Sequence, residues 1–345
     1  MAELEKKRIT MKDVAKEAGV SVATISYVLN GKESISEETK ERVMVAIKKL
    51  NYVPNLAARS LVNQSSGLIG VVIPQTEDSN MLMFNNPFYS EMIGSIEYQA
   101  RIQGYQILIS GTDADEGYIR MAKERSLDGI IIIGMYPDHF YNELKKFNIP
   151  IVLVDSYCED HYFHSVQVND RYGAYIATKY LIDHGHRSIG LLAGMLKCRG
   201  VVEMRYNGYC DALKEYGIPH RSDLIFESKV DYKSGMEMGE QVIKSSRRPT
   251  ALFATADIMA IGAIKRMTQL GASVPEDISV IGFDDLNIAE YFNPGLTTVR
   301  QEIKRKGQEA ARIILECIGN PSAGKQEIIL PLSIVERESV LSIKK

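Results

Sequence analysis

The stretch TMKDVAKEAGVSVATISYVLNGKESISEETKERVMVAIKKL, residues 10–50, contains three runs of helical periodicity separated by polar and glycine residues. Thr10 is followed three residues later by Asp13, a spacing typical of a capped helix start. Gly19 then marks the end of this first helix, because glycine adopts the left-handed backbone of a helix end without steric cost. The sequence therefore predicts a short helix that is bounded on both sides.

Two more helices are expected directly after it. Ser21 can cap a helix over residues 22–29, and a third helix is expected from about Ser36 to Leu50. Two short helices across a glycine-containing turn, braced by a third, form a helix-turn-helix unit. Helix lengths alone leave two functions open, namely DNA binding and a small helical bundle that binds a protein partner.

Longer motifs in residues 10–61 resemble the DNA-binding headpiece of the lactose-repressor (LacI/GalR) family. The matching segments are D-V-A-x-x-A-G-V-S, T-I-S-x-V-L-N, S-E-E-T-x-x-R-V and Y-x-P-N-x-x-A-R-S-L. The resemblance implies a sequence-specific transcriptional regulator, with repression as its expected action, that has no enzymatic activity. It also implies that residues of the second helix contact operator DNA, namely Ser21, Val22, Ala23, Thr24, Ser26, Tyr27 and Asn30.

These side chains differ in what they can read. Val22 and Ala23 lack hydrogen-bonding groups, so they can offer base edges only apolar contact, for example to thymine methyl groups. Tyr27 occupies a position where many family members carry arginine, and tyrosine cannot make the bidentate contact to guanine. We therefore expect an unusual operator sequence. The polar residues are expected to contact phosphates, which fix register rather than sequence.

Residues 55–66 are expected to form a hinge helix and linker between the headpiece, residues 1–54, and the remainder. The resemblance implies that Leu61 inserts into the minor groove as a wedge that bends the duplex. It further implies that Ala58 allows close approach, while Asn55 and Arg59 contact the DNA backbone. A helix this short is marginal in isolation. The hinge is therefore expected to form only when paired with its mate in a homodimer on a pseudo-palindromic operator.

Residues 67–345 alternate short β-rich runs with helical stretches, a pattern that indicates an α/β fold with parallel, doubly wound sheets. Strands are expected at 68–73, 105–109, 129–133, 151–154, 165–168, 188–192, 224–226, 251–254 and 278–281. This number of strands favours two lobes, although a sequential two-domain split is the simpler alternative. Segments such as LIGVVIP, DGIIIIG and VIGFDD resemble the family's effector domain, which is similar to periplasmic sugar-binding proteins. That likeness implies three crossovers, with lobe one at 67–160 and 293–323 and lobe two at 161–292 and 324–345.

The resemblance places a small-molecule effector, a sugar or sugar derivative, between the lobes at the carboxyl ends of the strands. Phe88 and Tyr89 are expected to stack on a sugar ring. Arg205 matches the family's effector-binding arginine, whose fork suits paired hydroxyls or an anionic group. Asp284 matches the acid that accepts hydrogen bonds from the ligand, and Asp155, at the end of its strand, is a further candidate.

Two departures concern the effector. Many family members read F-x-x-N-D where this chain has Ala256 before Asp257, so one polar contact to the ligand is missing and Asp257 is interpreted as a helix cap. Lys197 and Arg199 lie in a loop that often touches ligand, and they suggest an anionic effector such as a sugar phosphate. The alternative is that both cations are simply solvated.

Composition limits the remaining choices. The chain has a net charge of −3, yet residues 1–63 hold 11 basic and 8 acidic residues, which suits a phosphate-binding surface. No long apolar run or apolar leader is present, which predicts a cytoplasmic protein without a membrane partner. Nucleotide-binding and catalytic motifs are absent, and four unclustered cysteines predict no metal and no cofactor. Two alternatives stay open: control by a phosphorylated carrier protein, and a sugar-binding or sugar-processing protein with a vestigial headpiece.

Overall fold

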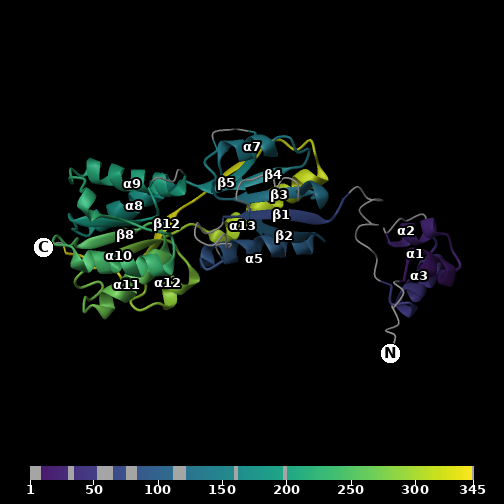
Figure 1. Ribbon diagram of the computed structural model, residues 1–345, viewed down its shortest axis with the longest axis horizontal. Coiled ribbons are helices and arrows are strands. Elements are labelled where there is room, and N and C mark those ends of the chain that lie inside the picture. Colours follow the sequence, from purple (N-terminus) through teal and green to yellow (C-terminus); the bar gives the residue numbers. More distant parts are fainter. Residues whose placement is uncertain are drawn as a thin grey trace, which may run out of the picture. The chain divides into compact units, whose positions relative to one another are not determined.

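The computed structural model describes residues 9–29, 35–52, 65–74, 84–111, 122–158, 162–196 and 200–343. The chain divides into two compact units, residues 1–66 and 67–345, and each is described by itself (Figure 1). No helix among the described residues is both long and apolar enough to cross a membrane.

The first unit contains the three expected helices, α1 (Met11–Ala18), α2 (Val22–Leu29) and α3 (Glu37–Lys49). The backbone N–H of Thr10 donates to the Asp13 carboxylate at 2.8 Å, and Gly19 ends α1 with a φ of 65°. The N–H of Thr24 donates to the Ser21 hydroxyl at 3.0 Å and thereby caps α2. The helices close over a small core of Val14, Ala15, Ala18, Ile25, Val43, Ala46 and Tyr52. The helix-turn-helix prediction is confirmed.

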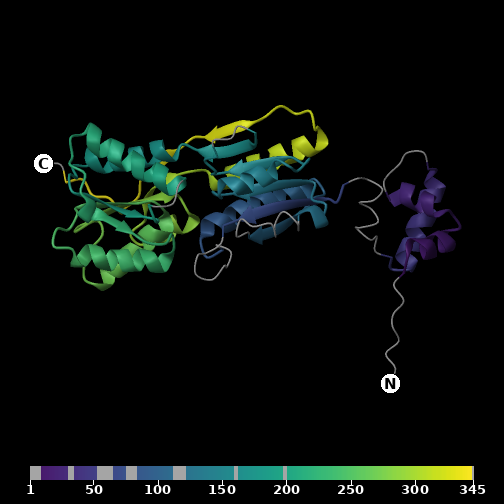
Figure 2. The same ribbon diagram turned by 45° about the horizontal axis from the view of Figure 1, so that its top comes forward.

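The second unit is built on two six-stranded sheets. The first sheet has the order β11-β5-β4-β3-β1-β2, and all of its pairs are parallel. Its strands are β1 (Leu68–Ile73), β2 (Gln106–Gly111), β3 (Gly129–Ile133), β4 (Ile151–Val154), β5 (His164–Val168) and β11 (Glu327–Leu330). In the turned view of Figure 2, β11 lies beside the strands of this sheet, far from them in sequence.

The second sheet has the order β12-β10-β9-β8-β6-β7, and only β12 runs antiparallel to its neighbour. Its strands are β6 (Ile189–Ala193), β7 (Ile225–Glu227), β8 (Ala251–Ala254), β9 (Ser279–Asp284), β10 (Thr297–Arg300) and β12 (Ser333–Val335). The predicted α/β fold with two parallel-dominated sheets is confirmed.

Helices cover both sheets. The first lobe carries α5 (Pro87–Ile102), α7 (Asp138–Leu144) and α13 (Ile303–Gly319), and the second carries α8 (Asp170–Asp183), α9 (Val201–Glu215), α10 (Tyr232–Lys244), α11 (Asp257–Gln269), α12 (Asn287–Tyr291) and a 3-10 turn at Ser222–Leu224. Close approach of α13 to α5 requires glycine at Gly307, since a Cβ there would lie 2.1 Å from the Ser95 hydroxyl. This contact fixes the depth at which α13 lies in the lobe.

The chain passes between the lobes three times, after β5, after β10 and after β11. The boundaries differ from the expected ones. Residues 161–292 and 324–345 were expected in lobe two, yet β5 and β11, which lie in these ranges, belong to the first sheet. Residues 293–323 were expected in lobe one, yet β10, which lies there, belongs to the second sheet. Sheet membership depends on which strand each segment pairs with, and that pairing is a tertiary contact without a local sequence signature.

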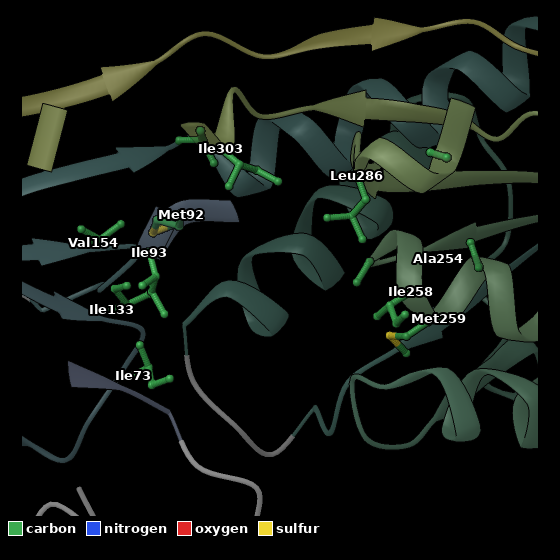
Figure 3. Close-up of a cluster of buried hydrophobic side chains, with 14 of the residues drawn as sticks. Ile73, Met92, Ile93, Ile133, Val154, Ala254, Ile258, Met259, Leu286 and Ile303 are labelled. Carbon is green, nitrogen blue, oxygen red and sulfur yellow. The ribbon is translucent and has the colours of Figure 1, made fainter. Parts of the chain in front are cut away.

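A large core cluster includes side chains from both lobes. Figure 3 draws members from each of them, and Ile303 at the start of α13 comes from the second crossover. The labelled residues are Ile73, Met92, Ile93, Ile133, Val154, Ala254, Ile258, Met259, Leu286 and Ile303. Because the strand ends of both sheets are buried in this way, polar side chains that follow those strands are held in apolar surroundings.

Candidate functional site

The start and outward face of α2 expose four of the predicted DNA-contacting residues, whereas Thr24 and Ser26 are half-buried. Val22 and Tyr27 are each 41% exposed, and Ser21 and Ala23 are also exposed. Ile25 is the fully buried residue of this helix, and the half-buried Val28 and Leu29 also pack against the core of the first unit. Ser21 has a second role, because its hydroxyl lies 2.9 Å from that of Thr24 and caps the helix.

Several predicted DNA contacts lie outside the described residues. These are Asn30 and the hinge residues Asn55, Ala58, Arg59 and Leu61. Their assignments stay predictions. Lys197 and Arg199, which suggested an anionic effector, also lie outside the described residues.

All five predicted effector residues line one cavity of about 160 Å³ in the second unit. Phe88, Tyr89 and Asp155 come from the first lobe, and Arg205 and Asp284 come from the second. The remaining lining residues, which were not predicted as ligand contacts, are Asn86, Ile133, Gly134, Val201, Val202, Val230, Thr255, Ala256 and Gln301. Most of this lining is aliphatic or aromatic, so the cavity has apolar walls and a small number of charged groups.

Local structure explains how these residues are held. Asn86 caps α5, accepting the N–H of Phe88 at 3.1 Å, which places both aromatic residues in the first turn of that helix. Asp155 directly follows β4 with a φ of 51°, and Asp284 ends β9 with a φ of 126°. Non-glycine residues with positive φ are costly, and they cluster at functional sites because the surrounding structure must hold them there.

Arg205 is the centre of the charged group in the second lobe. Its Nε donates to Oδ1 of Asp170 at 2.7 Å, and its Nη1 donates to the carbonyl oxygen of Thr255 and lies 3.6 Å from Oδ1 of Asp284. The guanidinium carbon lies 3.6 Å from the centre of the Phe283 ring. Burial works to lower the pKa of Arg205, but the charges of Asp170 and Asp284 outweigh it and the pKa is raised. The guanidinium is therefore a fixed cation.

The sequence reasoning missed Lys306, which lies on α13 and is completely buried. Its ammonium donates to both carboxylate oxygens of Asp155, at 2.7 and 2.8 Å, and to Oε1 of Gln301 at 2.5 Å. The Gln301 amide nitrogen then donates to Oδ1 of Asp284. A hydrogen-bonded path thus runs from one lobe to the other.

A sequence signal for Lys306 did exist. On α13 the buried positions Ile303, Gly307, Ala310 and Ile314 recur at helical spacing, and Lys306 falls on this apolar face. A lysine there must either reach solvent or find a buried partner. The ammonium finds Asp155, at the end of a neighbouring strand.

Asp257 does not have the predicted capping role. The cap position of α11 is Ala256, and no side chain caps this helix. The Asp257 carboxylate instead accepts the Thr298 hydroxyl at 2.6 Å and the backbone N–H of Leu286 at 2.8 Å. Complete burial, with the nearby charge of Asp284, holds the pKa of Asp257 well above its usual range. This carboxyl fastens β10 and the loop after β9 to α11.

Burial also changes the titration of the cavity acids. It raises the pKa of Asp284 to about 6, although Arg205 and the Gln301 hydrogen bond oppose the shift. Burial raises the pKa of Asp155 as well, against the opposing charge of Lys306. The site therefore combines a fixed cation with an acid that titrates near neutral pH.

Comparison with known proteins agrees with both units. Residues 10–55 match bacterial regulatory proteins of the lacI family, and residues 178–340 match the periplasmic binding protein-like domain. The chain is 36% identical over 339 residues to the HTH-type transcriptional repressor PurR of Photorhabdus laumondii, covering 96% of this chain and 97% of that protein.

Solved structures give the same assignment. The Lac repressor dimer bound to operator and the anti-inducer ONPF aligns with a TM-score of 0.84 and 28% identity, over 97% of this chain and all of that one. A LacI-family regulator from Enterococcus faecium with bound ribose aligns with a TM-score of 0.72 and 28% identity, over 80% of this chain and all of that one. These relatives are transcriptional regulators and not enzymes. The chain therefore belongs to the lacI family of bacterial DNA-binding transcriptional regulators.

Proposed function

We propose that this repressor acts as a homodimer, that α2 of each copy reads one half of a pseudo-palindromic operator, and that a small molecule in the cavity between the lobes sets its affinity for DNA. The observation that carries the proposal is the convergence of all five predicted effector residues on one cavity. The Lac repressor structure, a dimer on its operator, supports the assembly. Because operator DNA lies in the bacterial cytoplasm, the proposal places the protein there.

The effector proposed here is a sugar or a sugar derivative. Asp284 accepts hydrogen bonds and Arg205 donates them, and hydroxyl groups can serve both. Phe88 provides an aromatic wall against which the C–H face of a ring can pack. The relative solved with ribose supports this class of ligand. Family members with asparagine at the position of Ala256 have a side chain there that can hydrogen-bond a ligand. Because the side chain of Ala256 cannot, we propose that the preferred sugar differs from theirs.

Regulation would act through the relative stability of two lobe arrangements. An effector that bridges Arg205 and Asp284 in one lobe and Phe88 in the other favours the arrangement in which both sets of contacts form. Such a ligand shifts the equilibrium only by its difference in affinity for the two states. Movement of the lobes would then order or melt the hinge helix, and with it the Leu61 wedge in the minor groove.

Selection of bound duplexes from a random DNA pool, at low and at moderate salt, tests the proposal. We expect an enriched pseudo-palindrome with a flexible central step, because a wedge favours steps that unstack easily. Binding without an enriched sequence, which disappears as salt rises, would contradict the proposal, since phosphate attraction alone behaves in that way. The enriched duplex then serves as the probe for an effector screen, in which Asp284→Ala should lose the response while it keeps operator affinity.

A further inference from the structure

The side-chain amide of Gln301 connects a cation of the first lobe with an anion of the second. Gln301 lies in the second crossover, between β10 and α13. Its Oε1 accepts from the ammonium of Lys306 at 2.5 Å, and its Nε2 donates to Oδ1 of Asp284. All three residues are at most 4% exposed, so water competes little for these bonds. Cation, amide and anion therefore form one chain of hydrogen bonds across the boundary between the lobes.

Lys306 fixes the direction in which this amide points. An amide has an oxygen that accepts and a nitrogen that donates, whereas an ammonium can only donate. The ammonium therefore holds the oxygen of Gln301 and turns the nitrogen toward Asp284. Hydrogen bonds in series polarise one another, and those made by a charged donor are the stronger ones. The bond that joins the lobes is thus better oriented and stronger when Lys306 is present.

Packing holds the ammonium in place within the first lobe. Gly307, the next residue, lets α13 approach α5 so closely that a Cβ there would lie 2.7 Å from the carbonyl oxygen of Met92. The ammonium also donates to both oxygens of Asp155, directly after β4, at 2.7 and 2.8 Å. Lys306 and Asp155 belong to the same lobe, so their pairing does not depend on where the other lobe lies. The bonds of Gln301 are the part of the network that does depend on it.

The backbone on both sides of this connection is strained. Asp284 has a φ of 126°, and Glu302, which directly follows Gln301 and precedes α13, has a φ of 40°. Non-glycine residues rarely adopt such angles, and the surrounding structure must hold them there. Strain of this kind is typical of switch regions. The second crossover is therefore a place where the chain would relax if the amide lost its partners.

We propose that Lys306 is a positioning residue that, through Gln301 and Asp284, holds the two lobes in the arrangement of this structure when no effector is bound. The inference rests on the proposed function, because it concerns the lobe equilibrium through which the effector acts. An effector that prefers this arrangement gains affinity from Lys306, since the competent state is already populated before the effector binds. An effector that prefers the other arrangement must overcome the same network.

A second link between the lobes does not involve Lys306. The hydroxyl of Tyr157, in the loop after β4, donates at 2.6 Å to Oδ2 of Asp170, the first residue of α8. Because this link remains when Lys306 is replaced, the replacement should shift the lobe equilibrium and should not abolish the closed arrangement. The test must therefore measure populations of two states and not a single mean structure.

Distances between spin labels on the two lobes, measured by double electron–electron resonance, provide these populations. The labels are attached to genetically encoded ketone side chains, because the chain has four native cysteines. One pair replaces Asn142 on α7 and Lys214 on α9, and a second pair replaces Arg101 on α5 and Lys233 on α10; all four residues are exposed. In Figure 1 the first two helices lie along one edge of the lobes and the other two along the opposite edge, so rotation of a lobe changes at least one distance. An excess of unlabelled chain keeps two labelled copies from meeting in one dimer.

Lys306→Met should raise the ratio of open to closed populations at least about tenfold, because a hydrogen bond from a charged donor is worth about that much. Lys304→Met is the matched control, since Lys304 is an exposed lysine on the same helix, and it should keep the distances of the wild type. Unchanged distances for both label pairs in Lys306→Met would overturn the proposal.

Two further variants separate this role from a contribution to the stability of the first lobe. Gln301→Leu removes the bridging amide and leaves the pair of Lys306 and Asp155, so it should open the lobes as Lys306→Met does. The double variant Lys306→Met, Asp155→Leu removes the buried pair as a whole, which is often neutral for stability. It still leaves the amide without its cation and should shift the populations. Wild-type distances in either variant would show that packing alone closes the lobes and would overturn the proposal.

The result can be distinguished from a failure of the proposed function. The label distances are measured without DNA and without effector, whereas duplex selection depends on the headpiece and the hinge. An enriched operator together with unchanged distances would leave the regulator intact and remove only this inference. Shifted distances without an enriched operator would retain the role of Lys306 and contradict the proposed function.

Discussion

The helix α2 and the effector cavity use opposite means to present functional groups. In α2 one buried residue, Ile25, anchors a helix whose apolar Val22 and aromatic Tyr27 remain exposed. In the cavity the charged groups Asp155, Arg205, Asp284 and Lys306 are buried and held by one another. A DNA-reading surface must be open to a large partner, whereas a small ligand is recognised best where water is excluded. Substitutions of exposed residues of α2 should therefore alter recognition with little effect on stability, whereas substitutions of the buried charged groups in the cavity should affect both.

Among the substitutions proposed in this section, Lys306→Met should cause the largest loss of stability, because it breaks the hydrogen-bonded network beside the cavity. Removal of one partner from a buried ion pair leaves Asp155 uncompensated, at a cost of about 3–5 kcal/mol in the free energy of unfolding. Urea denaturation monitored by circular dichroism measures the loss. Lys304→Met is the matched control, because Lys304 is an exposed lysine on the same helix, and it should change stability by no more than about 0.5 kcal/mol.

The double variant Lys306→Met, Asp155→Leu sharpens the same test. Replacement of a whole buried pair by apolar residues is often neutral, so most of the lost stability should return. If the double variant is as unstable as Lys306→Met, the loss comes from packing of the lysine stem and not from the unpaired carboxylate.

Ile25→Ala should weaken the packing of α2 against the core of the first unit. The side chain is completely buried in the small core of the first unit, and truncation of a buried isoleucine costs about 2–5 kcal/mol. The expected result is a lower melting temperature for the headpiece, with the second unit unaffected. Operator affinity should fall with it, because Ile25 is the fully buried contact that holds the reading face of the helix, with Val28 and Leu29 only half-buried against the same core. An unchanged melting temperature would show that α2 is held elsewhere.

The contrast between the two regions also explains what the sequence could predict. Helix ends at Thr10, Gly19 and Ser21 follow from local backbone chemistry, and the structure has all three. The strands at 68–73, 129–133, 151–154 and 251–254 are confirmed to the residue, because short runs of buried β-branched and aliphatic residues have few alternatives. These features depend only on residues close together in the chain.

The network around Lys306 depends on residues far apart in the chain. Asp155 and Lys306 are separated by 151 positions, and no spacing rule connects them. The same limit applies to β5, β10 and β11, whose sheet depends on their pairing partners. Phe88, Tyr89, Arg205 and Asp284 were found because family motifs mark them, and Asp155 because it follows a predicted strand. Lys306 was missed because it lies in none of those motifs and follows no strand. The role given to Asp257 was wrong for a related reason: Thr298 and Leu286, which hold it, lie on other elements.

Asp284→Asn should make stability less dependent on pH. A carboxyl whose folded-state pKa is raised to about 6 from 3.8 favours folding when protonated, so the wild type loses stability as the pH rises from 4 to 7. A shift of this size corresponds to about 3 kcal/mol. Urea midpoints at pH 4.5 and 7.5 should therefore differ less in the variant than in the wild type. Equal pH dependence in the two proteins would assign the titration to another acid.

Tyr27→Ala should leave folding almost unchanged and should alter only the recognition of DNA. The ring is 41% exposed, so its removal should change the free energy of unfolding by less than about 1 kcal/mol. A contact to a base edge is worth about 1–3 kcal/mol of discrimination, and its loss should relax sequence preference at one position in each half-site. Repeated duplex selection with the variant measures this. Uniform weakening at all positions would instead assign Tyr27 to the phosphate backbone, because phosphate contacts fix register and carry no sequence information.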